Sequence, residues 1–304
     1  MKKIVVAAIS VVLSLVLVVA IVLAGNTFLY YPHYRANKQE ASIEIAQTNK
    51  ITMMSYNLRC ISPTDFGKKA WFYRADLVVK DIEGKKPGII GFQEATKWHY
   101  SYLVECLPGY DSIITYRDEA FNSEGCPIFY NTALYTLVEK GSFWLSETPD
   151  EASKGWDGAC NRITTWAILK DKTTGFVYAH FNPHLEHVGE KAQAESGPLI
   201  ASKIAEIAPD IPVVLTGDFN LTEDSGNYVN IISCDLRDTK SLAEKYDDCA
   251  TYHDFNPFIF STKPIDFIFV NGYCKSVKSS IVDSSTVGLV YPSDHFPVIV
   301  EMTL

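Results

Sequence analysis

The stretch VVLTGDFN, residues 213–220, runs from residues typical of a buried strand directly into a carboxylate and an amide. Residues i and i+2 of a strand project from the same face, so Asp218 and Asn220 are expected to aim at one point. Asp and Asn at a strand end also commonly close a turn through their own backbone. A carboxylate beside an amide can instead hold and deprotonate a water molecule. Other motifs in the chain must therefore decide whether these two residues form a turn or a hydrolytic site.

Polar residues also stand at the end of, within or just before other apolar, strand-like runs. Asp266 is the most informative of these polar residues because Ile265 and Phe267 flank it, and a carboxylate in such surroundings costs several kcal/mol unless it is paired. A histidine ring N–H is a suitable partner. The polar residues are Asn57 in SYNLR, Glu94 in GFQEA, His184 in FNPHLEH, Asp266 in PIDFIF, and Asp294 and His295 in PSDHFPV.

Taken in order, the motifs YNLR, GFQE, NPHL, GDFN, IDFIFV and SDHFPV resemble those of the endonuclease/exonuclease/phosphatase superfamily. DNase-like nucleases, neutral sphingomyelinases and inositol polyphosphate 5-phosphatases share its fold. The resemblance covers Thr52 to Leu304. It implies a four-layer α/β/β/α sandwich, in which two mixed β-sheets are flanked by helices.

The resemblance also implies a divalent metal, Mg²⁺ or Mn²⁺, and a phosphate ester as the substrate. Hard Mg²⁺ prefers oxygen ligands and keeps several of its waters. Glu94 is the expected metal ligand, with Asn57 beside it and Asp294 as a secondary metal or orienting residue. Arg162, which precedes TTW, is expected to bind the substrate phosphate or to form a structural salt bridge.

The remaining motif residues are implied to be catalytic. Hydrolysis of a phosphate ester needs an oriented water and neutralisation of charge on the phosphoryl oxygens. Asp218 is expected to deprotonate the water that Asn220 helps to hold. His295, oriented by Asp266, is expected to contact the phosphate, and His184 to donate a second hydrogen bond.

The chain departs from the family pattern at Pro183, where threonine is usual, so the loop that carries His184 is expected to sit differently. A zinc hydrolase built on His184, His187 and Glu190 is a weaker alternative because HExxH and HxxEH are both absent. An inactive, membrane-tethered binding module is another alternative, although the chain keeps every motif residue.

The substrate is less constrained than the reaction. The formal net charge is -9, and sequence-blind nucleic-acid binders usually need a basic surface. A phosphodiester is nevertheless preferred from the sequence, as in a nuclease or sphingomyelinase, with a phosphomonoester of a small metabolite as the alternative. Nucleic acid, a phospholipid head group and a small metabolite all stay open as substrates, and no protein partner is implied.

Short β-rich runs recur along the chain, and helical spacing is confined to residues 73–84 and 189–208. Gly84 is expected to end the first helix. Between residues 220 and 265 at most a short helix is expected. Many strands with few helices favour two packed sheets with the helices outside.

The N-terminus differs from the remainder. Residues 4–24 carry no charge and follow Lys2 and Lys3; as a helix they would span roughly 31 Å at about 1.5 Å per residue. Residues 1–24 are therefore predicted to be a transmembrane signal anchor or a cleaved signal peptide, residues 25–48 a juxtamembrane linker, and residues 49–304 the catalytic domain. Either form places the domain outside the cytoplasm, anchored to the membrane or secreted.

Overall fold

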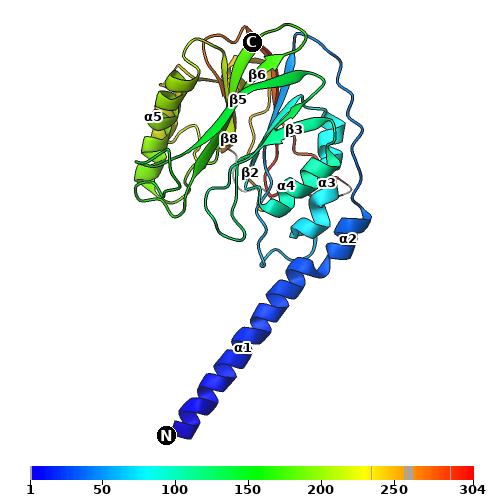
Figure 1. The fold of residues 1–304 in the computed structure, drawn as a ribbon, viewed down its shortest axis with the longest axis vertical. Coiled ribbons are helices and arrows are strands. Elements are labelled where there is room, and N and C mark those ends of the chain that lie inside the picture. Colours follow the sequence, from blue (N-terminus) through cyan, green and yellow to red (C-terminus); the bar gives the residue numbers. More distant parts are fainter. Residues whose placement is uncertain (1, 234, 257, 259–262, 288) are drawn as a thin grey trace.

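The computed structural model describes residues 2–233, 235–256, 258, 263–287 and 289–304, without the side chains of residues 2–4, 7–8 and 26–27. Two β-sheets face each other, and helices cover the outer face of each sheet (Figure 1). Both sheets are mixed, as predicted.

The first sheet has seven strands in the order β10-β12-β13-β1-β2-β4-β3. Its β1–β2 and β10–β12 pairs are parallel, and the other pairs are antiparallel. The strands are β1 (Ile51–Asn57), β2 (Ile89–Gln93), β3 (Tyr110–Ile113), β4 (Ile128–Asn131), β10 (Ala243–Tyr246), β12 (Ser276–Val282) and β13 (Val298–Thr303).

The second sheet has six strands in the order β5-β6-β7-β8-β11-β9. Only the β7–β8 pair is parallel among those described. The strands are β5 (Tyr135–Trp144), β6 (Ile163–Asp171), β7 (Val177–Pro183), β8 (Val213–Asp218), β9 (Arg237–Asp238) and β11 (Asp266–Val270).

The period-two alternation of the strands builds the four predicted layers. In β1, Met53 faces the other sheet and belongs to the core between the sheets, whereas Met54 points outward into the core beneath the helices. A third core joins the outer face of the second sheet to its own helices. The helices over the first sheet are α3 (Trp71–Lys85) and α4 (Lys97–Cys106), and those over the second are α5 (Glu190–Ile207) and α6 (Gly226–Ile232); a single turn, α7 (Thr239–Leu242), precedes β10.

The two helices predicted from their spacing form, as α3 and α5. Gly84 does not end α3, because the helix continues to Lys85 and Lys86 takes the left-handed conformation at φ 52°. The elements without a strong periodic signal were missed, namely α4 and the strands β9, β10 and β12. Their burial depends on neighbours that are distant in sequence.

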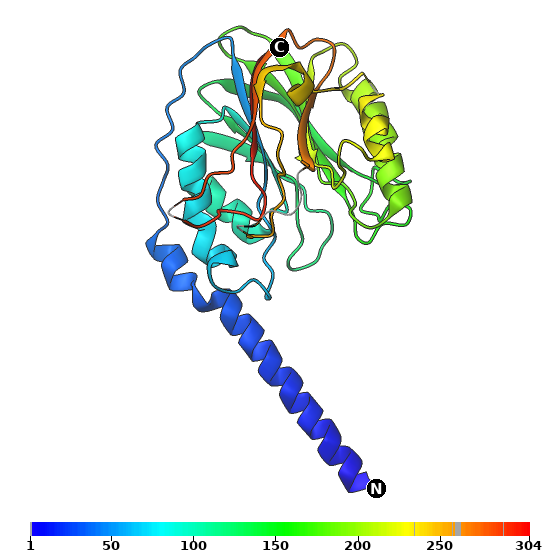
Figure 2. The same cartoon turned by 180° about the vertical axis from the view of Figure 1, so that it is seen from behind.

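The N-terminus begins with α1 (Lys2–Leu29), a helix that extends away from the body (Figures 1 and 2). Its large apolar side chains are more than half exposed from Val5 to Val22. No helix in the described part of the chain is both long and apolar enough to cross a membrane, so the predicted transmembrane helix is not found.

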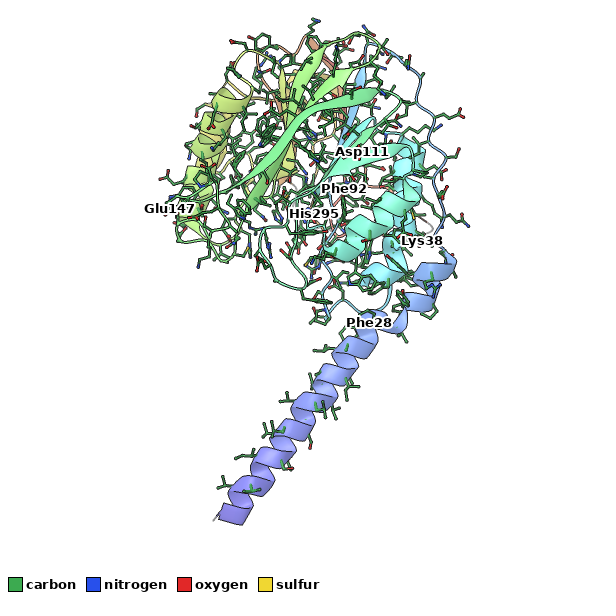
Figure 3. All side chains as sticks on the ribbon, in the orientation of Figure 1. Phe28, Lys38, Phe92, Asp111, Glu147 and His295 are labelled. Carbon is green, nitrogen blue, oxygen red and sulfur yellow. The ribbon has the colours of Figure 1, made fainter. Side chains whose placement is uncertain are left out.

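The segment predicted as a linker packs on the domain. After α2 (Tyr31–Ala36), residues 37–50 run along the body to the start of β1 (Figure 2). Tyr34 is 7% exposed within the core under α3 and α4. Phe28 lies where α1 meets the body (Figure 3), with its ring 5.4 Å from that of Phe72. The Ala41 amide donates to the Cys106 carbonyl at 2.8 Å.

Candidate active site

Strand directions bring the predicted residues to one edge of the sandwich. The carboxyl ends of β1, β2, β7 and β8 carry Asn57, Glu94, His184 and Asp218. Because β11 and β13 run antiparallel to β8 and β1, their first residues reach the same edge. Asp266 lies directly opposite Asp218 in the β8–β11 ladder.

Asn57 joins the two sheets at this edge. Its Nδ2 donates to Asp218 Oδ2 at 2.8 Å and to Glu94 Oε1 at 3.1 Å. Its Oδ1 accepts from the Arg59 amide at 2.9 Å. In this orientation Asn57 holds two carboxylates from different sheets beside each other. As a metal ligand, Asn57 would instead present its amide oxygen to the cation.

Glu94 occupies a strained backbone position, with φ 59°, directly after β2. Left-handed φ is uncommon outside glycine, and such strained positions cluster at functional sites. The Cys60 amide donates to Glu94 Oε2 at 2.6 Å. Burial alone raises the pKa of Glu94, but the Cys60 hydrogen bond and the charge of His295 outweigh burial and hold this pKa below its usual value. Glu94 is thus a carboxylate at neutral pH.

Asp266 and His295 form the predicted pair. His295 Nδ1 lies 2.8 Å from Asp266 Oδ2, and the two residues are 6% and 2% exposed. Burial lowers the pKa of His295, yet the charge and hydrogen bond of Asp266 dominate and raise it to about 10. The imidazolium is therefore present at neutral pH, and its Nε2 lies 3.9 Å from Asp218 Oδ2.

Asp218 is 1% exposed. Burial, reinforced by the charge of Asp266, raises its pKa to about 7. Its Oδ1 accepts from the Asn220 amide at 2.9 Å, so the turn suspected from the sequence is present together with the polar cluster. A carboxyl group with a pKa near neutrality is suited to accept a proton from water.

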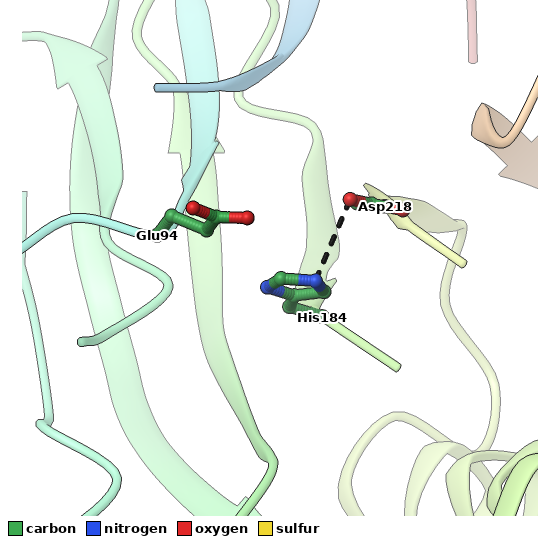
Figure 4. A group of neighbouring side chains, drawn as sticks. All are labelled: Glu94, His184 and Asp218. Carbon is green, nitrogen blue, oxygen red and sulfur yellow. Dashed lines mark ion pairs between the residues drawn. The ribbon is translucent and has the colours of Figure 1, made fainter. Parts of the chain in front are cut away.

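His184 reaches the site despite Pro183. Proline ends β7, where it pairs with Thr164. His184 Nε2 lies 3.4 Å from Asp218 Oδ2 (Figure 4) and 3.1 Å from Asn220 Nδ2. Burial, together with the charge of Arg162, lowers the pKa of His184 well below its usual value, so the ring is neutral.

Arg162 forms one of its two expected contacts, the structural salt bridge. Its Nε lies 3.5 Å from Glu186 Oε2, which is the salt bridge considered from the sequence, and its Nη2 lies 2.7 Å from His187 Nδ1. The arginine is 6% exposed and lines the same pocket as His184 and Asp218. It is positioned to donate hydrogen bonds into that pocket.

Asp294 lies behind the pocket wall. It is 2% exposed, and its Oδ2 is 3.8 Å from Arg59 Nε. Burial raises the pKa of Asp294 to about 6. Arg59 also donates to both carboxylate oxygens of Asp65, at 3.1 and 3.2 Å, so the arginine of the YNLR motif is fixed between two acidic residues.

The site opens into a cavity of about 450 Å³, which is the size of a pocket for a small molecule. Three charged lining residues were not singled out from the sequence: Arg59, Arg117 and Glu124. The first is visible in YNLR, whereas Arg117 and Glu124 lie in a loop without a recognisable motif. The cavity is lined by Arg59, Cys60, Glu94, Arg117, Glu124, Cys160, Arg162, His184, His187, Asp218, Asn220, Tyr252, Ile265 and His295.

The acidic and histidine residues fit a divalent metal. Donor atoms of Glu94, His184 and Asp218 lie within 4.8 Å of one another (Figure 4), and the two carboxylates supply the oxygens that hard cations prefer. A second group of Asp218, Asp266 and His295 also meets this distance, but its Asp266–His295 hydrogen bond already uses two donor atoms. Neither described group includes His187 or Glu190, which removes the support for the zinc alternative.

The two packed sheets and the polar site at their edge are those of a protein of the DNase-like class. The chain belongs to the endonuclease/exonuclease/phosphatase family, whose model matches residues 54–295. Hydrolysis of phosphoesters is the chemistry of this superfamily.

Solved structures of two *Bacteroides thetaiotaomicron* proteins are similar to this chain. One is an endonuclease/exonuclease/phosphatase family protein, with 37% identity, a TM-score of 0.80, and coverage of 84% of this chain and 98% of its own. The other is a mannosyl-6-phosphatase, with 36% identity, a TM-score of 0.77, and coverage of 84% and 100%.

Curated relatives are more distant. The 3'-5'-exoribonuclease subunit Ccr4 of the CCR4-Not complex from *Schizosaccharomyces pombe* is 22% identical over 301 residues, which cover 81% of this chain and 42% of the relative. A mimivirus protein matches over 60% of its length and Nocturnin of *Drosophila melanogaster* over 42%. The chain thus spans about half the length of the curated relatives it matches.

Proposed function

We propose that this protein is a divalent-metal-dependent hydrolase that removes phosphate from monoesters of small polar metabolites. The observation that carries the proposal is the convergence of Glu94, Asp218 and His295 in one pocket of about 450 Å³. A pocket of this volume suits a small molecule rather than a polymer.

The choice of a monoester departs from the phosphodiester that the sequence alone favoured. Net charge of -9 is unfavourable for binding a polyanion by its backbone. The similarity to a mannosyl-6-phosphatase over 84% of the chain also supports a monoester. The more distant exoribonuclease relative supports only the shared hydrolytic chemistry.

The proposed roles follow from the geometry. Glu94, His184 and Asp218 would hold the metal, which supplies Lewis-acid stabilisation of the phosphoryl oxygens when bound. Asp218 accepts a proton from the attacking water, which Asn220 orients. The positively charged His295, held by Asp266, donates to a phosphoryl oxygen.

Two further residues complete the assignment. Arg162 donates to the phosphate from the pocket wall, because a guanidinium has five N–H donors and its contacts with Glu186 and His187 leave others available. Asp294 orients Arg59, whose Nε lies 3.8 Å from Asp294 Oδ2. Mg²⁺ and Mn²⁺ are the proposed metals because two of the three donors are carboxylates.

A substrate panel tests the proposal. The purified full-length chain, stripped with EDTA and reloaded with Mg²⁺, Mn²⁺ or Zn²⁺, is assayed on p-nitrophenyl phosphate, hexose phosphates, bis-p-nitrophenyl phosphate, RNA, plasmid DNA and sphingomyelin. We expect monoester hydrolysis that Mg²⁺ or Mn²⁺ restores. Faster cleavage of the diesters would overturn the monoester preference, and activity with Zn²⁺ alone would overturn the metal assignment.

We also propose that the catalytic domain acts outside the cytoplasm and that residues 1–24 direct its export. Lys2 and Lys3 followed by an uncharged run are typical of an export segment, and the large apolar side chains of α1 from Val5 to Val22 are more than half exposed. A C-terminal alkaline phosphatase fusion, which is active only after export, is expected to be active with the full chain and inactive without residues 1–24. Equal activity of both fusions would contradict the export role.

A further inference from the structure

Arg117 and Glu124 form a bidentate salt bridge on the wall of the active-site cavity. Arg117 Nη1 and Nη2 donate to the two oxygens of Glu124 at 2.8 and 3.0 Å. The side chains are 18% and 14% exposed. The Arg117 amide also donates to the Glu124 carbonyl at 2.9 Å, so backbone and side chains close the same loop between β3 and β4.

Neighbouring strands fix this loop in place. Trp144 Nε1 at the end of β5 donates to the Arg117 carbonyl at 2.8 Å, and Asn161 Nδ2 donates to the same oxygen at 3.1 Å. The Ala95 and Gly125 amides and carbonyls exchange hydrogen bonds at 3.1 and 2.9 Å. The pair is therefore held rigidly next to the residue that follows Glu94.

The pair lies on the side of the pocket that carries Glu94. Displacement at phosphorus is in line, so the leaving oxygen departs opposite the attacking water. The proposed water lies at Asp218, and Figure 4 shows Glu94 across from Asp218 with His184 between them. Arg117 and Glu124 share a pocket wall with Glu94 and His184. With the attacking water at Asp218, this wall would border the space for the departing alcohol.

The chemistry of the pair matches hydroxyl groups. A hydroxyl donates one hydrogen bond and accepts others, and an arginine beside a carboxylate offers both functions without net charge. Among the described residues that line the cavity, Tyr252 is the one aromatic side chain apart from the histidines, and it is absent from the wall beside Glu124. That wall therefore lacks the flat apolar surface on which a nucleobase stacks.

We propose that Arg117 and Glu124 form a subsite for the hydroxyl groups of a polyol leaving group, so that the substrates are phosphorylated sugars or sugar alcohols. This inference rests on the proposed monoesterase function and adds the residues that select the alcohol. The carboxylate accepts from one hydroxyl while the guanidinium donates to its neighbour.

A selectivity ratio tests the subsite. The ratio compares kcat/KM for mannose 6-phosphate with kcat/KM for p-nitrophenyl phosphate, whose leaving group carries no further hydroxyls. Glu124→Gln removes the charged acceptor while keeping the side-chain shape. We expect the ratio to fall about 10- to 100-fold, the range for losing a hydrogen bond to a charged group.

Glu119→Gln is the matched control, because Glu119 is exposed on the same loop, and its ratio is expected to equal that of the wild type. Arg117→Lys keeps the positive charge but not the bidentate geometry. The same ratio is measured for Arg117→Lys if Glu124→Gln lowers the melting temperature. An unchanged ratio in the folded variant, or a wild type that cleaves p-nitrophenyl phosphate but no sugar phosphate, overturns the subsite. A wild type that cleaves no monoester at all overturns the proposed function itself.

Discussion

At the scale of single residues, the site consists of ionisable groups whose pKa values are shifted in different directions by burial and by neighbouring charges. Asp218 has a pKa of about 7, His295 has a pKa of about 10, and the pKa of His184 is well below its usual value. Near neutral pH the site therefore holds a proton acceptor, an imidazolium and a neutral imidazole within one pocket. Such divergence of neighbouring groups is how acid and base roles are assigned in hydrolytic sites.

Asp218→Asn tests the proton acceptor. The amide preserves the shape but cannot take a proton, so kcat on p-nitrophenyl phosphate is expected to fall by about 10²- to 10⁴-fold. The melting temperature is expected to stay the same or rise, since a buried charge opposite Asp266 is removed. Asp224→Asn, at a carboxylate 63% exposed, is the control and should retain full activity. A kcat for Asp218→Asn within tenfold of the wild type would refute the role.

At the scale of elements, a buried polar network sets how the two sheets meet below the site. Asn182 on β7 is 0% exposed. Its Nδ2 donates to the Phe92 and Pro127 carbonyls at 2.8 and 3.0 Å, and its Oδ1 accepts from Gln93 at 2.7 Å and Thr216 at 2.9 Å. One amide therefore ties together the strands that carry Glu94, His184 and Asp218.

Asn182→Ala should break this connection. The substitution leaves buried carbonyls without a donor and opens a small cavity, which together lower the free energy of unfolding by about 2–4 kcal/mol. Denaturant unfolding measures this loss. Asn122→Ala, which removes one hydrogen bond from an exposed side chain to the Ile61 carbonyl, is expected to change stability by less than about 0.5 kcal/mol. Equal losses in both variants would show that the network adds nothing.

Asp81 on α3 makes stability depend on pH. Burial, reinforced by the charge of Asp283, raises the pKa of Asp81 from 3.8 to about 7. The folded protein thus binds this proton more tightly than the unfolded chain. The resulting stabilisation is fully present below the unfolded pKa of 3.8 and is lost progressively as pH rises to about 7.

Asp81→Asn mimics the protonated carboxyl group. Melting curves are expected to show the variant more stable than the wild type at pH 8, with the difference shrinking toward pH 5. Asp210→Asn, at an exposed carboxylate, should follow the wild-type curve at every pH. A constant offset between Asp81→Asn and the wild type would contradict the proposed titration.

At the scale of the whole molecule, the N-terminal region divides into a projecting part and a packed part. Most of α1 extends from the body (Figure 1), whereas Tyr31 and Tyr34 join the aromatic cluster over α3 and α4. The ring of Tyr34 lies 4.6 Å from that of Tyr102, and the ring of Tyr31 lies 6.2 Å from that of Trp98. The folded unit therefore begins near the end of α1 and not at β1.

Two truncations test this boundary. Removal of residues 1–24 is expected to leave the melting temperature and the activity of the purified domain unchanged. Removal of residues 1–36 also deletes Phe28, Tyr31 and Tyr34, and it should lower the free energy of unfolding by about 3 kcal/mol, as expected for lost aromatic burial. If both truncated proteins unfold at the same denaturant concentration, the aromatic contacts do not stabilise the domain.

Much of the site could be predicted from the sequence because its residues lie at the ends of strongly apolar strands. Asn57, Glu94, His184, Asp218, Asp266 and His295 all stand at such ends, and each strand direction then brings them to one edge. Period-two burial is a local property, so the strands that carry these residues were also predictable.

Contacts between distant segments were decided only by the tertiary structure. Arg117 and Glu124 carry no motif, and their place beside Glu94 follows from how the loop between β3 and β4 docks on β5. Likewise, residues 25–48 are polar enough to be taken for a linker, yet they pack because Phe72 and Trp98 offer an aromatic surface. The residue pattern that forms a strand is a local property of the sequence. The protonation states and the shape of the pocket arise only when separate elements pack together and exclude water.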